Sequence, residues 1–179
     1  MNIVSTIMQM LAPVIINKIA ASLGVNQGLA GKAIAVIVPA ILAGLAGKAA
    51  TSAGAQDLSA TLGRQDPNIL GELGKMIGAP GQQSFTDKGN SLFGSLLGGS
   101  SKNALADAIG KFSGLSGGQS SSLMGMLAPV VLGGLAKQQK ASNLDASGLA
   151  NMLAGQKNNI AAAMPAGFSD LLAGSGLME

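Results

Sequence analysis

Residues 33–46 read Ala-Ile-Ala-Val-Ile-Val-Pro-Ala-Ile-Leu-Ala-Gly-Leu-Ala, and residues 123–136 read Leu-Met-Gly-Met-Leu-Ala-Pro-Val-Val-Leu-Gly-Gly-Leu-Ala. Each of these two apolar runs contains a proline, Pro39 or Pro129, and these prolines stand 90 residues apart. The glycines five residues after them, Gly44 and Gly134, have the same spacing. The same spacing relates Ile19 to Ile109 and Gly24 to Gly114, and after a slip of one residue Leu58 matches Leu149 and Leu62 matches Leu153. Self-similarity at one spacing over nearly the whole chain predicts two tandem copies of a small domain.

We therefore expect a first copy at residues 1–79, a linker at 80–90 and a second copy at 91–179, each around a proline-containing central helix. A copy of this size is short for an independent hydrophobic core. The copies are thus expected to pack against each other or against other subunits.

Apolar residues recur at helical spacing, and no alternating strand pattern occurs, so the sequence predicts an all-α fold. Pro13 should kink or split the first helix near Ala12, and Ser116 with Gln119 fits a capping box at the start of the second core helix. Besides this second core helix, the helices expected from these patterns span residues 3–22, 29–50, 57–62, 66–77, 91–97, 102–113, 145–154 and 157–163, and a last short helix starts at residues 169–170. Short Gly/Ser/Ala segments are expected at 52–56 and 98–101.

The composition indicates an unusually neutral surface. Charged residues make up 11% of the 179 residues, against about 25% in a typical soluble domain. The chain also has 27 glycines and 2% aromatic residues, so helices with small side chains could pack closely. This composition favours self-assembly over an isolated monomer.

The sequence lacks the residue types that most catalytic mechanisms require. The chain has no histidine and no cysteine, which removes the Ser-His-Asp triad and thiolate or imidazole metal sites. Gly114-Leu-Ser-Gly-Gly118 matches a nucleophile elbow, but it has neither a base nor a preceding strand. The carboxylates are scattered singly, although sequence alone leaves a paired-carboxylate hydrolase open. We expect no enzymatic activity, no cofactor and no metal.

The net charge is +3, and Lys18, Lys32 and Lys48 precede the first acidic residue. These lysines are candidate contacts to an anionic surface. Arg64 is the single arginine, and the chain has no Tyr or Trp. Because base reading relies on Arg and stacking relies on aromatic side chains, this composition argues against specific nucleic-acid recognition. Lysines still allow nonspecific phosphate contacts.

The compartment is expected to be the cytoplasm. The N-terminus, Met1-Asn-Ile-Val4, has no basic segment of the kind that begins a secretory signal. The longest apolar stretches are about 14 residues, whereas a bilayer span needs about 20. Unconventional export or association with the cell envelope stays open.

Three segments of the second copy carry a family resemblance: Lys102-Asn-Ala-Leu-Ala-Asp-Ala-Ile-Gly-Lys-Phe-Ser-Gly-Leu-Ser-Gly-Gly-Gln119, Met126-Leu-Ala-Pro-Val-Val-Leu-Gly-Gly-Leu-Ala-Lys137 and Leu149-Ala-Asn-Met-Leu-Ala-Gly-Gln156. They resemble the YidB-like bacterial family of unknown function, and the first copy resembles it more faintly. The resemblance implies a small all-helical bacterial domain of homeodomain-like shape, with no catalytic residues to carry over. Larger relatives append an outer-membrane-protein-A-like peptidoglycan-binding domain, which residues 1–179 do not contain, so no envelope role is implied.

The function expected from these features is a non-enzymatic structural or interaction protein that associates with itself, as a homo-oligomer or an open filament. Pro39, Gly44, Pro129 and Gly134 are the residues expected to serve the core or the assembly. One alternative is a peripheral membrane- or lipid-binding helical protein that uses Lys18, Lys32 and Lys48. The other alternative is a nonspecific DNA-binding protein.

Overall fold

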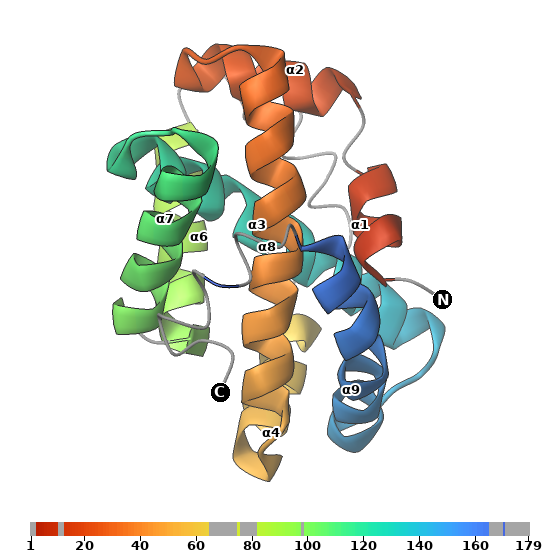
Figure 1. The fold of residues 1–179 in the computed structure, drawn as a ribbon. Helices are drawn as coiled ribbons and strands as arrows, with labels where there is room; N and C mark the ends of the chain where they lie inside the picture. Colours follow the sequence, from red (N-terminus) through yellow and green to blue (C-terminus); the bar gives the residue numbers. More distant parts are fainter. Residues whose placement is uncertain are drawn as a thin grey trace.

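The computed structural model describes residues 3–10, 13–64, 75, 82–97, 99–164 and 170. Within these residues the secondary structure is entirely helical, which confirms the all-α expectation (Figure 1). The helices are α1 (Ile3–Met10), α2 (Pro13–Leu23), α3 (Gln27–Ala49), α4 (Ser52–Gly63), α6 (Gln82–Leu97), α7 (Gly99–Ser113), α8 (Gly117–Ala141) and α9 (Ala146–Ala163).

Two long helices, α3 and α8, form the centre of the molecule. Every residue from Leu123 to Ala136 of α8 is buried, and so is nearly every residue from Ala33 to Leu42 of α3. A helix that is apolar around its whole circumference is stable only when other elements surround it. Each helix continues through its proline, Pro39 or Pro129, although a proline removes one backbone hydrogen bond.

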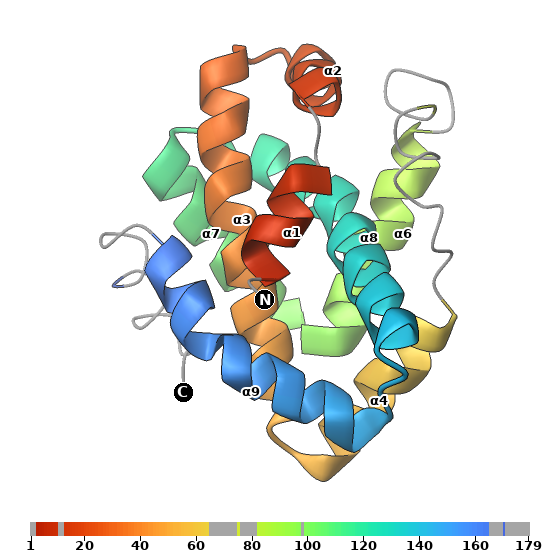
Figure 2. The same cartoon turned by 90° about the vertical axis from the view of Figure 1, so that its right-hand side faces the viewer.

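The shorter helices surround this central pair. In Figure 1, α6 and α7 lie on one side of α3 and α1 and α9 on the other, while α2 lies at the upper end and α4 at the lower end. α6 packs mainly on α8, whereas α9 packs on α3 and α4. Figure 2 shows α9 running beside α4 and α6 running beside α8. Helices from the C-terminal half therefore cover helices from the N-terminal half.

One hydrophobic cluster joins the two halves. It includes fully buried residues from α3 and α4, such as Ile37 and Leu58, and from α8 and α9, such as Leu127 and Leu149. Side-chain hydrogen bonds also connect the halves: Gln119 Nε2 donates to the Leu23 carbonyl at 3.1 Å, and Gln139 Nε2 to Ser59 Oγ at 2.9 Å. The halves thus pack against each other.

Local sequence sets where the central helices begin. The predicted capping box is confirmed, because the Gln119 amide N–H donates to Ser116 Oγ and the Ser116 N–H to Gln119 Oε1, both at 3.1 Å. Asn26 caps α3 by accepting from the Leu29 N–H at 2.6 Å. Before each cap the chain turns at a glycine with positive φ, 71° at Gly24 and 81° at Gly114, a conformation that costs other residues about 1–2 kcal/mol.

Several predicted boundaries were wrong. The helix expected at 57–62 begins at Ser52 instead, because Thr51 Oγ1 caps α4 by accepting from the Gly54 N–H at 3.0 Å. The expected break at 98–101 is wrong for residues 99–101, which belong to α7. The two helices expected at 145–154 and 157–163 are one helix, α9, whose buried Leu149, Leu153 and Ile160 lie on one continuous face.

The segment predicted as a linker, 80–90, is helical from Gln82 onward as part of α6. The helix expected to open at residue 91 therefore begins earlier, and Thr86 and Gly89 are buried against α8 despite the turn-rich composition of this segment. The split at Pro13 is as expected, with α1 and α2 on either side. The helices expected at 66–77 and from 169 onward lie outside the described residues except for Lys75 and Asp170, and the division of the chain into copies stays a prediction.

Candidate functional site

The four residues predicted to serve the core or the assembly lie on the central helices. Pro39, Pro129 and Gly134 are buried, and Gly44 is half-buried. Pro129 lies at the crossing of α8 with α6, where a Cβ on Gly89 would come within 3.0 Å of Pro129 Cδ. These residues therefore belong to the packing inside the molecule rather than to an exposed site.

The three lysines predicted as one anionic-surface contact do not come together. Lys32 and Lys48 lie 16 residues apart on α3, which is about 24 Å along a helix. Lys48 Nζ lies 3.8 Å from Asp57 Oδ2 at the lower end of the molecule. Lys32 Nζ lies 5.1 Å from the centre of the Phe112 ring, and Lys18 is exposed on α2.

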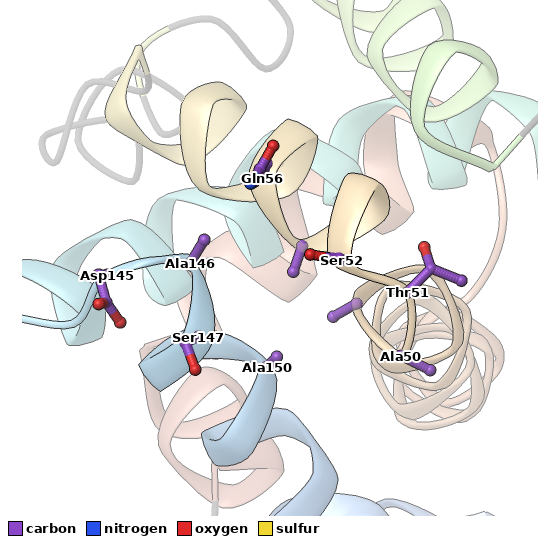
Figure 3. Close-up of a pocket in the computed structure, with 10 residues that line it drawn as sticks. Ala50, Thr51, Ser52, Gln56, Asp145, Ala146, Ser147 and Ala150 are labelled. Carbon is purple, nitrogen blue, oxygen red and sulfur yellow. The ribbon is translucent and has the colours of Figure 1, made fainter.

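A hollow of about 430 Å³ separates the first turns of α4 and α9 (Figure 3). Its lining is mostly short side chains from the end of α3 and from these two turns: Ala49, Ala50, Thr51, Ser52, Ala55, Gln56, Asp145, Ala146, Ser147 and Ala150. In Figure 3 the cap Thr51 and Ser52, at the start of α4, lie across from the cap Asp145 and Ser147, at the start of α9. The two walls come from opposite halves of the chain, so sequence analysis did not group them.

Two of the polar side chains of this hollow, Thr51 and Asp145, cap helices. Asp145 Oδ1 accepts from the Gly148 N–H at 2.7 Å, and Thr51 Oγ1 accepts from the Gly54 N–H at 3.0 Å. Among its lining residues Asp145 is the one ionisable group. Asp145 therefore has no second ionisable side chain among these lining residues with which to form an acid–base pair. Neither cap was predicted from the sequence, and their shared location depends on tertiary packing.

A smaller hollow of about 310 Å³ lies between α7 and the start of α8, lined by Ala106, Asp107, Gly110, Lys111, Leu115 and Gly117. Ser116, the residue of the nucleophile-elbow pattern, caps α8 beside it. Across the described part of the chain, no group of three His, Cys, Asp or Glu residues is placed to hold a metal ion.

Two of the described helices, α3 and α8, are long and apolar enough to cross a membrane by length and composition. However, 67% and 83% of their most apolar windows are buried inside the fold. Burial of this extent is typical of core helices in a folded domain.

Residues 5–138 match the family model described as "Bacterial protein of unknown function (DUF937)". The chain belongs to this family. No curated protein and no solved structure matches this chain.

The family match runs from α1 into the last turns of α8. It therefore includes the central pair and the crossing of α6 with α8. It does not include α9, whose first turn forms one wall of the larger hollow. The description of the family assigns no chemistry to this part of the chain.

Proposed function

We propose that this family member is a non-enzymatic structural protein that associates with itself, built from two copies of one helical unit. The unit is related to the YidB-like proteins through the segments around Pro129 and Leu149. The observation that carries the proposal of self-association is the exposed face of α9, which consists of short, uncharged side chains.

The duplication is supported by features that recur 90 residues apart. A glycine with positive φ precedes each central helix, at Gly24 and Gly114. A polar cap follows two residues later, at Asn26 and Ser116. α3 then begins at Gln27 and α8 at Gly117, so the same local signals start both central helices.

The neutral face of α9 follows the helical repeat. Its members, spaced alternately four and three residues apart, are Ser147, Asn151, Ala154, Asn158 and Ala161, all exposed. Lys157 is the one charged residue of α9, so a second copy meets little electrostatic repulsion there. Alanine and serine allow helix axes to approach to the short end of the usual 8–10 Å, and facing asparagines can pair through their amides, which fixes register in helix pairs.

The size of this face limits the strength of the contact. The 18 residues of α9 extend over about 27 Å, and a single helix pair of this length buries less than the ~800 Å² per partner of a standard stable complex. Association should therefore depend strongly on protein concentration. A face-to-face pair gives a closed dimer, whereas a head-to-tail contact with another surface gives an open filament.

Light scattering over a dilution series, with negative-stain imaging of the same samples, tests the proposal. Mass should rise with concentration for the unmodified chain, and Ala154→Glu should shift that rise to at least tenfold higher concentration, because it places a charge inside the contact. Ala60→Glu is the matched control, since Ala60 is an exposed helical alanine of α4. A monodisperse monomer at millimolar concentration would exclude self-association.

A further inference from the structure

Three exposed lysines lie on helix segments near the end of the molecule that α2 covers: Lys18 on α2, Lys32 near the start of α3 and Lys111 near the end of α7. Lys32 of α3 lies over the ring of Phe112 at 5.1 Å, which places Lys111, the neighbour of Phe112, beside the start of α3. Lys18 is exposed on α2, the helix that covers this end (Figure 1). We call these residues the lysine end.

Partly exposed apolar side chains belong to the same segments, from the end of α2 to the start of α3. Leu23, Val25 and Leu29 are each half-buried, and each packs on the core with part of its surface while leaving the rest accessible. Leu29 precedes Lys32 by three residues on α3, so the two side chains lie on neighbouring turns of one helix face. The lysine end therefore presents cationic and apolar groups together.

On α2, α3 and α7 near this end, the described lysines outnumber the described acidic residues. No acidic residue occurs before Asp57, so α2 and α3 contribute lysines alone. The nearby acid on α7 is Asp107, exposed one turn before Lys111. α8 also begins here, as the bond from Gln119 to the Leu23 carbonyl shows, and helix starts carry partial positive charge.

We propose that the lysine end docks on the surface of an anionic membrane. The lysines lie at the headgroups and Leu23, Val25 and Leu29 reach the boundary with the acyl chains. A phospholipid surface matches both kinds of group, whereas a nucleic-acid backbone matches the lysines alone. The set differs from the one predicted from sequence, because Lys111 from the second half takes the place of Lys48.

Vesicle co-sedimentation tests this docking with the full chain and vesicles of about 30% phosphatidylglycerol in phosphatidylcholine. Each lysine near such a surface contributes about fivefold to the partition coefficient. Lys32→Glu combined with Lys111→Glu should therefore lower binding at least ~25-fold, and Asp107→Asn should raise it about fivefold. Binding should weaken as salt rises.

The matched control is Lys137→Glu combined with Lys140→Glu, two exposed lysines near the other end of α8. It makes the same change in net charge and should leave most of the binding in place. Equal loss in both double variants would overturn the proposal, because it would show attraction by net charge alone. Absence of vesicle binding, or binding of duplex DNA in preference to vesicles, would overturn it as well. Circular dichroism checks that each variant is folded. The binding experiment is done at a protein concentration at which light scattering shows a single species, so that self-association does not affect the result.

Discussion

The crossing of α6 and α8 offers the sharpest test of the packing, because two glycines meet there. A Cβ added to Gly89 would overlap the carbonyl oxygen of Gly125 and lie 2.7 Å from its carbon. A Cβ added to Gly125 would lie 2.6 Å from the Thr86 carbonyl oxygen. The Gly125 carbonyl also lacks its usual intrahelical donor, since residue 129 is a proline. The two helices can approach this closely only without side chains at both positions.

The expected cost of Gly89→Ala follows from two opposing terms. Overpacking of a tight contact costs about 1–3 kcal/mol, and the upper part of that range applies because backbone atoms of α8 cannot rotate away. The better helix propensity of alanine offsets about 1 kcal/mol of this loss in the free energy of unfolding. The net loss is about 2 kcal/mol, which lowers Tm by roughly 4–8 °C for a chain of this size.

Gly94→Ala is the matched control, because Gly94 lies on the same helix and a Cβ there would meet nothing within 4 Å. That variant should gain up to ~1 kcal/mol. Thermal unfolding followed by circular dichroism at 222 nm, a wavelength that reports helix content, would measure both. If Gly89→Ala were as stable as Gly94→Ala, the close crossing of α6 and α8 would be refuted.

Three further variants test other parts of the fold by urea unfolding. Gly24→Ala should lower the free energy of unfolding by about 1 kcal/mol, because φ at this position is 71°. Gly47→Ala, where a Cβ meets open space, should not lower it. Equal stability of the two variants would contradict the left-handed turn at Gly24. Ser116→Ala removes the capping box and should lose about 1 kcal/mol, and an unchanged midpoint would show that the cap contributes little. Leu149→Ala, at a fully buried position, should lower the free energy of unfolding by about 3 kcal/mol. The rate of amide hydrogen exchange should then rise in α3 as well as in α9. A rise restricted to α9 would argue against the shared core.

The sequence predicted the features of the fold that depend on local signals. The central helices followed from the continuous apolar runs, and the start of α8 followed from Ser116 and Gln119. The start of α4 was mispredicted because the local cap at Thr51 was missed, whereas the start of α6 was mispredicted because tertiary contacts outweigh composition there. Residues 82–90 have turn-rich neighbours, yet they are helical because Thr86 and Gly89 fit against α8.

The candidate surfaces were less predictable, because they join residues that are far apart along the chain. The lysine end requires Lys111 and Phe112 of α7 to lie beside Lys32 of α3, and no spacing in the sequence indicates that contact. Lys48 had the same sequence context as Lys32 but lies at the opposite end of α3. The order of residues showed which groups are cationic, whereas only the packing showed which of them are neighbours.

The covering of α3 by α9 has a consequence during synthesis. Translation adds roughly 5–20 residues per second, so on the order of ten seconds pass between completion of α3 at Ala49 and of α9 at Ala163. Throughout this interval one of the most apolar helices of the chain lacks the partner that shields it. The growing polypeptide should therefore present a binding site for chaperones that recognise apolar segments, and it should lose that site when the C-terminal helix emerges and docks.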